Sequence, residues 1–234
     1  MSQVGQRERL TQQQVLRFLQ DQLGYRYLGD WKDRDGNRNI EEDLLRDWLA
    51  LQGHEERVIQ RALRELDQAT TISGSKTLYD ANRAVYEKLR YGVHVKPSQE
   101  EQTVTVWLID WNHSANNDFA VAEEVTVAGA NTKRPDVVLY VNGVALGVLE
   151  LKRSTVAVAE GIRQNLDNQK PEFIRPFFAT VQLLMAGSST EGLRYGVIET
   201  PEKYWLHWTE ASDIDDPLER SLHQLCRKER LLEL

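Results

Sequence analysis

The chain has 234 residues, of which 41% are hydrophobic and 28% are charged, a balance typical of a folded, water-soluble protein. It contains no apolar run of the ~20 residues that span a membrane and no signal peptide, so we expect a cytoplasmic protein without a membrane segment. A single cysteine excludes an internal disulfide, no Cys/His cluster has zinc spacing, and a net charge of −7 argues against DNA binding by charge alone.

The first third of the chain is predicted to be mainly helical. Thr11 caps an amphipathic helix, residues 28–39 form a polar turn region, and Asn39 with Glu42 resembles a capping box for the next helix. The last of these helices is expected to end at Gly92. The predicted helices cover residues 11–23, about 40–50, 58–70 and 78–92.

Strands are predicted to dominate the remainder. Residues 104–110 alternate between apolar and polar side chains, and 123–127 is expected to pair with them. Two further strands lie within 134–152, a helix covers 159–169, and a charged helix spans 217–232. The last predicted strands cover residues 181–187, 193–199 and 204–208.

These elements predict an α/β fold, in which a mixed β-sheet core with a crossover helix is flanked by helices and preceded by a helical N-terminal region. We expect residues 1–76 to form that helical region and to pack on a core of residues 77–212. Residues 213–234 are expected to form a C-terminal helix that leads towards a motor domain outside this chain.

The most informative pattern consists of Asp136, Glu150 and Lys152, within RPDVVLYVNGVALGVLELK (134–152). Two carboxylates suit Mg²⁺, which prefers oxygen ligands and usually takes only one or two from the protein, and the backbone carbonyl of Leu151 would add another. Lys152 follows Glu150 by two residues, on the same face of a strand, where its charge would assist the attack of water on a phosphodiester. Apolar residues enclose Glu150, and a charge inside a buried run requires a reason. The pattern therefore predicts a metal-dependent phosphodiesterase, with a buried hairpin that carries ordinary end charges as the alternative.

The Asn142-Gly143 turn imposes a condition on this site. With a two-residue loop, an unbroken ladder places Asp136 opposite Leu149 and turns Glu150 to the other face. A three-residue loop, or a bulge inside either strand, brings Asp136 and Glu150 to one face. The functional interpretation therefore predicts an odd loop or a bulge in this hairpin.

The stretch resembles the nuclease motif of the PD-(D/E)xK superfamily, with Pro135-Asp136 and Glu150-Leu151-Lys152 as its signature. Together with residues 23–31, 108–127, 164–173 and 176–208, it resembles the N-terminal endonuclease domain of the R (restriction, motor) subunit of type I restriction–modification enzymes. The resemblance covers most of the chain. It implies a restriction-endonuclease-like core and Mg²⁺-dependent hydrolysis of double-stranded DNA, with Asp136 and Glu150 as metal ligands and Lys152 positioning or deprotonating water.

The resemblance also implies a Gln-x-x-x-Tyr motif on the helix after the catalytic strands. Gln164 matches the glutamine and is expected to act in catalysis, whereas Asn168 stands at the tyrosine position. The two side chains share a helix face, where both could bind DNA phosphate or a metal-bound water. The superfamily often adds an acid from an earlier helix, and the candidates here are Glu41, Glu42 and Glu87.

Basic residues near the motif are candidates to contact DNA. The main ones are Arg134, Arg153 and Arg163, and Asn168 is a further candidate. The acidity of the chain nevertheless predicts weak DNA binding by this segment alone.

The resemblance finally implies a larger enzyme. Family members couple an ATP-driven DNA translocase to cleavage, and this sequence has no Walker A motif, so ATP is expected to serve motor domains of the same subunit outside this chain. The expected partners are double-stranded DNA and the methyltransferase (M) and specificity (S) subunits. A docking or DNA-binding module that has the nuclease fold but no cleavage activity by itself is the alternative function.

Overall fold

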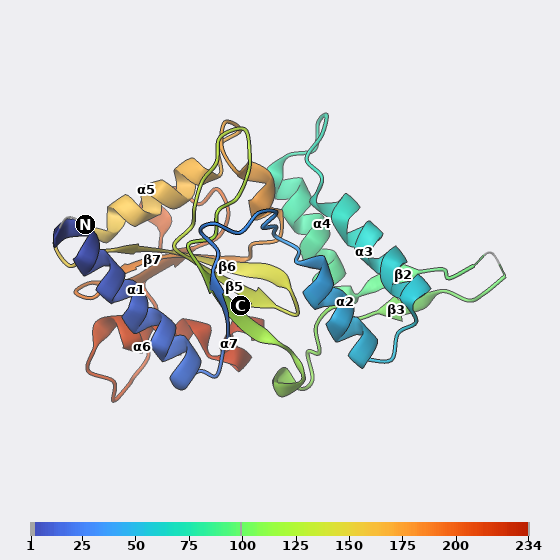
Figure 1. Cartoon of the computed structure of the whole chain (residues 1–234), viewed down its shortest axis with the longest axis horizontal. Helices are drawn as coiled ribbons and strands as arrows, with labels where there is room; N and C mark the ends of the chain where they lie inside the picture. Colours follow the sequence, from blue (N-terminus) through green and yellow to red (C-terminus); the bar gives the residue numbers. More distant parts are fainter. Residues whose placement is uncertain (1–2, 99, 234) are drawn as a thin grey trace.

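Six strands form a mixed sheet at the centre of the protein (Figure 1). They are β1 (Arg26–Asp30), β4 (Phe119–Glu123), β5 (Val137–Val141), β6 (Val144–Lys152), β7 (Leu183–Ser188) and β8 (Gly192–Gly196), in the order β1-β4-β5-β6-β7-β8. Parallel pairing joins β1 to β4 and β6 to β7, and the other neighbours pair antiparallel. The computed structural model describes residues 3–98 and 100–233. The predicted α/β class with a mixed, restriction-endonuclease-like sheet is confirmed.

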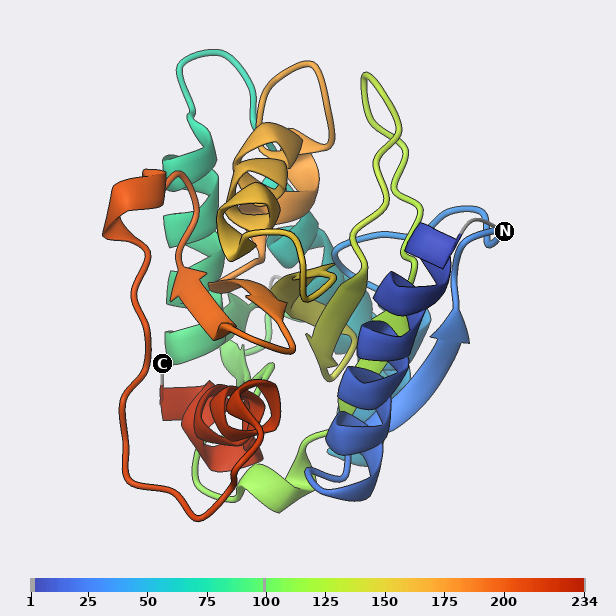
Figure 2. The ribbon, with the colours of Figure 1, turned by 90° about the vertical axis from the view of Figure 1, so that its left-hand side faces the viewer.

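Helices cover both faces of this sheet (Figure 2). The helices are α1 (Gln3–Asp21), α2 (Glu42–Leu51), α3 (Glu56–Thr70), α4 (Leu78–Tyr91), α5 (Val158–Asn168), α6 (Pro217–Cys226) and α7 (Lys228–Glu233). Short 3₁₀ turns are η1 (Ser114–Asn116), η2 (Arg175–Ala179) and η3 (Glu202–Tyr204). The α5 helix lies on one face of the sheet, whereas α1 and α6 lie on the other. The α2, α3 and α4 helices extend from one end, together with a small sheet of β2 (Val93–Val95) and β3 (Val104–Val106) (Figure 1).

The β6 strand connects the two hydrophobic cores. Its first eight residues are buried. Leu149 and Leu151 pack in the core that includes α1 and α6, whereas Val148 packs with Ile162 of α5. Because side chains alternate along a strand, Glu150 points to the α5 side.

The N-terminal predictions need two corrections. The predicted turn region 28–39 includes the end of β1, which the sequence pattern misses because Gly29 and polar neighbours hide the strand. Asn39 does not cap α2, because that helix begins three residues later with Glu41 at its N-cap position. The Asn39 amide instead donates a hydrogen bond to the carbonyl of Pro176. The helix over 78–92 does end at Gly92, with φ 77°.

The strands predicted around residues 104–127 are shifted. Of the predicted strand 104–110, only Val104–Val106 forms a strand, and it pairs with β2 rather than with residues 123–127. The corresponding strand of the main sheet, β4, ends at Glu123, because the next residue, Glu124, adopts left-handed backbone with φ 51°.

Two predictions near the C-terminal end are also wrong in part. The predicted strand 204–208 is reduced to an isolated bridge between Tyr195 and Leu206. The charged helix predicted over 217–232 is divided at Arg227, whose extended backbone separates α6 from α7.

The predicted division at residues 76 and 212 stays a prediction, although segments from all three regions share one core. Leu19 of α1, Leu149 of β6 and Leu222 of α6 belong to the same hydrophobic cluster, and β1 is a strand of the main sheet. Within the described residues, no helix has the length and apolar character required to cross a membrane.

Asn142 and Gly143 form the tight turn between β5 and β6. Their φ angles are 52° and 83°, as a two-residue hairpin turn requires. The buried Asn142 amide donates to the carbonyl of Leu108 and to Oδ1 of Asn117. The turn therefore has two residues, and not the three of one predicted alternative.

A bulge in β6 corrects the register of this hairpin. Leu139 pairs with Gly147, so Leu146 is the extra residue that the partner strand does not match. When this register is continued past the end of β5, Asp136 comes opposite Glu150. The predicted bulge is confirmed, and it brings the two acids to the face of the sheet that α5 covers.

Candidate active site

Asp136 stands directly before β5, at the end of the sheet next to Glu150. Its Oδ2 accepts a hydrogen bond of 2.7 Å from the backbone N–H of Leu151. In an antiparallel ladder the N–H and C=O of one residue point to the same neighbouring strand, so the Leu151 carbonyl faces the side of Asp136. Two of the predicted metal ligands therefore lie together.

Glu150 is a fully buried carboxyl group. Burial raises the pKa of Glu150 well above its usual range, the neighbouring Asp136 carboxyl raises it further, and the Lys152 ammonium opposes the shift. The Oε2 atom accepts a 2.5 Å hydrogen bond from the Gln164 amide, and Oε1 accepts one of 3.2 Å from Asn168. Two amides from α5 thus fix both oxygens of this carboxyl group.

Gln164 connects the acid to the lysine of the motif. Its Oε1 accepts a 2.6 Å hydrogen bond from Lys152 Nζ, while its Nε2 donates to Glu150. The arrangement depends on α5 crossing above β6, where Gly161 lets the helix approach. A Cβ atom at Gly161 would lie 3.4 Å from the Glu150 carbonyl and 3.1 Å from Ala186 Cβ. Four residues predicted from the sequence, Asp136, Glu150, Lys152 and Gln164, therefore meet at one point.

Asn168, a predicted DNA contact, is buried beside Glu150. Its side chain is only 1% exposed, because its position on α5 points towards the sheet and not towards solvent. The amide donates to Glu150, and Oδ1 is a buried atom without a hydrogen-bond partner. Asn168 is thus a buried neighbour of the carboxyl group, and its contact with DNA stays a prediction.

Two of the three predicted DNA-binding arginines are exposed and pair with acids. Arg134 Nε contacts Glu124 Oε2 at 2.6 Å, and Arg163 Nε contacts Glu202 Oε2 at 2.9 Å. Arg153 is partly exposed directly after β6. Arg134 and Arg153 thus flank the two motif strands, while the pair with Glu202 directs Arg163 towards η3.

The candidate helical acids have partners elsewhere. Each one forms an ion pair with an arginine of the N-terminal half: Glu41 with Arg34, Glu42 with Arg38 and Glu87 with Arg83. Nothing in these contacts favours any of the three as a member of the site.

The residue that the sequence interpretation missed is Glu124. Its backbone N–H donates to the carbonyl of Asp136 at 2.8 Å, so it continues the ladder of β4 and β5 beyond their ends. Its charge also contributes, after burial and Asp136, to the raised pKa of Glu150. The available signal was an acidic pair at the end of an apolar strand, but only the left-handed backbone at Glu124 explains its position.

The site fits a hard divalent cation. Asp136 and Glu150 are two carboxyl groups in contact, one of them fully buried, and such a pair requires a proton or a cation between them. The unpartnered Asn168 Oδ1 adds a buried oxygen beside Glu150. Within the described residues no group of three or more His, Cys, Asp or Glu is arranged to hold a metal. Two carboxylates and a carbonyl agree with Mg²⁺, which keeps several waters, and not with zinc.

Curated relatives of this chain are subunits of type I restriction enzymes. The HindI endonuclease subunit of Haemophilus influenzae is 25% identical over 189 residues, which is 74% of this chain and 18% of that protein. The SsaAORF53P endonuclease subunit of Staphylococcus saprophyticus is 21% identical over 64% of this chain and 16% of its own length. The putative MjaIXP endonuclease subunit of Methanocaldococcus jannaschii is 27% identical over 57% of this chain and 13% of its own length.

The chain thus spans less than a fifth of the length of each of these relatives. A family described as the type I restriction enzyme R protein N terminus matches residues 5–203. This match covers the sheet, α5 and every residue of the motif. The chain therefore belongs to the family of type I restriction enzyme R protein N termini.

Proposed function

We propose that this chain is the Mg²⁺-dependent DNA endonuclease domain of a type I restriction enzyme R subunit. The observation that carries the proposal is the hydrogen-bonded group in which Gln164 joins Lys152 to Glu150, with Asp136 beside it. The family assignment supports a role in restriction, and the site supplies the chemical groups for hydrolysis of a phosphodiester.

Asp136, Glu150 and the Leu151 carbonyl would hold the cation. Bound there, Mg²⁺ would offset the charge of the phosphodiester and make water a better nucleophile. Lys152 donates hydrogen bonds to a phosphate oxygen and stabilises the negative charge that grows during attack. Gln164 fixes the position of Lys152 and the orientation of Glu150, so neither group has to reorganise during the reaction.

The remaining functions of the enzyme belong to other segments and subunits. We propose that motor domains of the same R subunit use ATP to translocate DNA, and that cleavage follows translocation. Methyltransferase and specificity subunits would supply recognition of the DNA sequence, in the cytoplasm. Because the chain carries a net charge of −7, these partners would also supply most of the affinity for double-stranded DNA.

Calorimetric titration with Mg²⁺, on wild type and on Asp136→Ala, tests the site directly. Wild type is expected to bind Mg²⁺ and Asp136→Ala to lose that binding, because Asp136 is one of the two proposed carboxylate ligands. Binding that is unchanged in Asp136→Ala would refute the ligand assignment.

Cleavage by the complete restriction complex tests the reaction. Asp136→Ala and Lys152→Ala are expected to abolish cleavage while ATP-driven translocation continues. Normal nicking by either variant would refute the catalytic assignment.

A docking module that has the nuclease fold but does not cleave is the second candidate. Its specific support is Glu150, which is buried and has a raised pKa. Glu150 also accepts a hydrogen bond from Asn168, which stands where the family pattern has tyrosine. Translocation and cleavage that both survive in Asp136→Ala and Lys152→Ala would favour this module.

A further inference from the structure

Glu124 and Arg134 form an ion pair at the edge of the candidate active site. Glu124 directly follows β4, and Arg134 stands two residues before Asp136. The segment between them, residues 125–133, leaves the sheet as a loop that projects beyond the strand ends (Figure 2). The two residues therefore stand at the base of this loop, one on each side.

The backbone holds Glu124 next to Asp136. Its φ of 51° is uncommon for a residue with a side chain, and such conformations persist where surrounding contacts enforce them. Here the enforcing contacts are the hydrogen bonds from Glu124 N–H to the Asp136 carbonyl and from Val125 N–H to the Pro135 carbonyl. Strained backbone of this kind clusters at functional sites.

The backbone positions of three acids therefore form a row at the ends of three adjacent strands, from Glu124 to Asp136 to Glu150, and the charge of Glu124 acts on Glu150. Like charges on neighbouring strands destabilise a sheet, so the row requires compensating cations. Glu124 is not part of a three-acid metal site among the described residues. Its compensating charge is Arg134, with 2.6 Å between Nε and Oε2.

The geometry of this pair leaves Arg134 able to bind a second anion. Glu124 takes the Nε side of the guanidinium, while the two terminal amino groups carry four more N–H donors in a planar fork suited to phosphate. The Arg134 side chain is 46% exposed, whereas that of Glu124 is 23% exposed. The acid is thus the inner partner and the arginine the outer one.

We propose that Glu124 is a positioning residue that aims Arg134 at the DNA phosphate next to the scissile one. This inference rests on the proposed nuclease function. Arg134 would contact the substrate, and Glu124 would act only through Arg134. The pair would fix the register of the DNA backbone over Asp136 and Lys152, as phosphate contacts do in other DNA-binding proteins.

The test measures DNA cleavage by the complete restriction complex as a function of DNA concentration. Arg134→Ala and Glu124→Ala are both expected to raise the DNA concentration for half-maximal rate about tenfold or more, the loss typical of a hydrogen bond to a charged group. The maximal rate should change little. Glu124→Gln preserves the side-chain shape and an acceptor for Arg134, so its effect should have the same direction and be smaller.

The sign of the Glu124→Ala effect discriminates between the two roles. An acid that merely sits near DNA repels it, so its removal should strengthen binding; a positioning acid should weaken productive binding when removed. The slope of log affinity against log salt should also be smaller by about 0.9 in Arg134→Ala than in wild type, the value for one phosphate contact on B-DNA. A normal or improved half-saturating concentration in both Glu124→Ala and Glu124→Gln would overturn the proposal.

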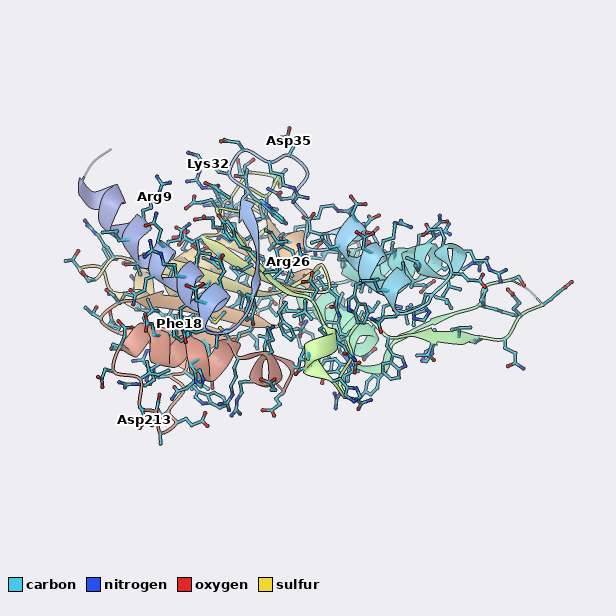
Figure 3. The ribbon with its side chains drawn as sticks, turned by 60° about the horizontal axis from the view of Figure 1, so that its bottom comes forward. Arg9, Phe18, Arg26, Lys32, Asp35 and Asp213 are labelled. Carbon is cyan, nitrogen blue, oxygen red and sulfur yellow. The ribbon has the colours of Figure 1, made fainter. Side chains whose placement is uncertain are left out.

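A matched ion pair serves as the control. Arg26 and Asp118 are bonded at 2.5 Å with side-chain exposures of 51% and 31%, close to those of the proposed pair. Arg26 lies at the start of β1, away from the loop that carries Lys32 beyond the other end of the strand (Figure 3). Arg26→Ala removes the same charge, but at the end of β1 away from the site. It should therefore change the half-saturating DNA concentration less than twofold if the effect of Arg134 depends on its position.

A charge exchange separates positioning from stability. In Glu124→Arg/Arg134→Glu the ion pair can form again, so the free energy of unfolding should recover, while the outer position now presents an acid to DNA. Cleavage is expected to remain impaired. Recovery of normal cleavage in the exchanged variant would reduce the pair to a structural role. Lys152→Ala, assayed alongside, separates failure of the proposed function from failure of this inference. Normal cleavage by Lys152→Ala would refute the proposed function. Inactive Lys152→Ala together with unaffected Glu124 variants would refute only this inference.

Discussion

Glu150 is a fully buried ionisable side chain in the site. A carboxyl group without solvent exposure, beside a second carboxyl group, is stable only when protonated, hydrogen-bonded or joined by a cation. The amides of Gln164 and Asn168 supply the hydrogen bonds. Mg²⁺ would supply the charge, so the residue that costs stability in the free protein is the one that would make the site bind a cation.

The raised pKa of Glu150 predicts a pH-dependent stability. Because its pKa is raised, Glu150 binds a proton more tightly in the folded state than in the unfolded state, where the ordinary pKa is about 4.3. This tighter proton binding stabilises the folded state. Its contribution to the free energy of unfolding is fully present below the unfolded-state pKa and is lost as pH rises through the raised folded-state pKa. Glu150→Gln should lack this loss. Urea unfolding of both proteins over a pH series, with chelator present, measures the difference; parallel curves for the two proteins would contradict the expectation.

Gln164 and Asn168 should differ in what their removal affects. Gln164→Ala breaks the link between Lys152 and Glu150, so it should reduce cleavage by about a hundredfold or more, as loss of a positioning group does. Asn168→Ala should mainly cost about 1–3 kcal/mol of stability, the cost of removing one partner from a buried polar group. Cleavage rates and urea midpoints of both variants test this. A larger cleavage defect in Asn168→Ala would mean that Asn168 has the role of the family tyrosine.

At the scale of elements, the sequence predicted regular segments better than irregular ones. The α3 and α5 helices follow from apolar periodicity, and the β5–β6 hairpin from its Asn142-Gly143 turn. The β1 strand was missed because its five residues include Gly29 and no alternating apolar pattern. A bulge in this hairpin was predictable only because a metal site needs Asp136 and Glu150 on one face of the sheet; its position at Leu146 comes from the structure. The role of Glu124 was not predictable, since it depends on one left-handed residue.

A side chain at Gly143 should destabilise the hairpin turn. A Cβ atom there would lie 2.8 Å from the backbone of Glu41 and Leu45, in addition to the strain of φ 83°. Gly53 offers the matched control, because it has φ 86° but no atom within 4 Å of an added Cβ. Gly53→Ala should cost about 1–2 kcal/mol from strain alone, and Gly143→Ala about 1–3 kcal/mol more from overpacking.

Urea unfolding of these two glycine variants gives the comparison. Equal losses in Gly143→Ala and Gly53→Ala would show that α2 moves freely away from the turn. A larger loss in Gly143→Ala would show that α2 helps to fix the hairpin that carries the bulge and the acids.

At the scale of the whole molecule, the site depends on segments far apart in the sequence. The sheet face opposite α5 is covered by α1 and α6, whose Leu19 and Leu222 pack in one cluster with Leu149 of β6 (Figure 3 shows Phe18 of α1 near α6). The motif residues are close in the sequence and could be predicted from it. The segments that keep their strands buried come from both ends of the chain, where no motif marks them.

This dependence makes a prediction about the division at residues 76 and 212. A fragment of residues 77–212 lacks β1, α1, α2, α3, α6 and α7, so it loses part of the core that covers the sheet face opposite α5. Leu149 and Leu151 would then face water. Burial of each such side chain contributes about 1.5–3 kcal/mol to the free energy of unfolding, which is a large part of a typical domain stability of about 5–15 kcal/mol.

The fragment is therefore expected to show no cooperative urea transition, whereas the whole chain should unfold in a single one, measured by circular dichroism and tryptophan fluorescence together. A cooperative transition of the 77–212 fragment would show instead that this segment is an independent core. In that case the N-terminal helices would be an added layer, and the two acids would need no support from them.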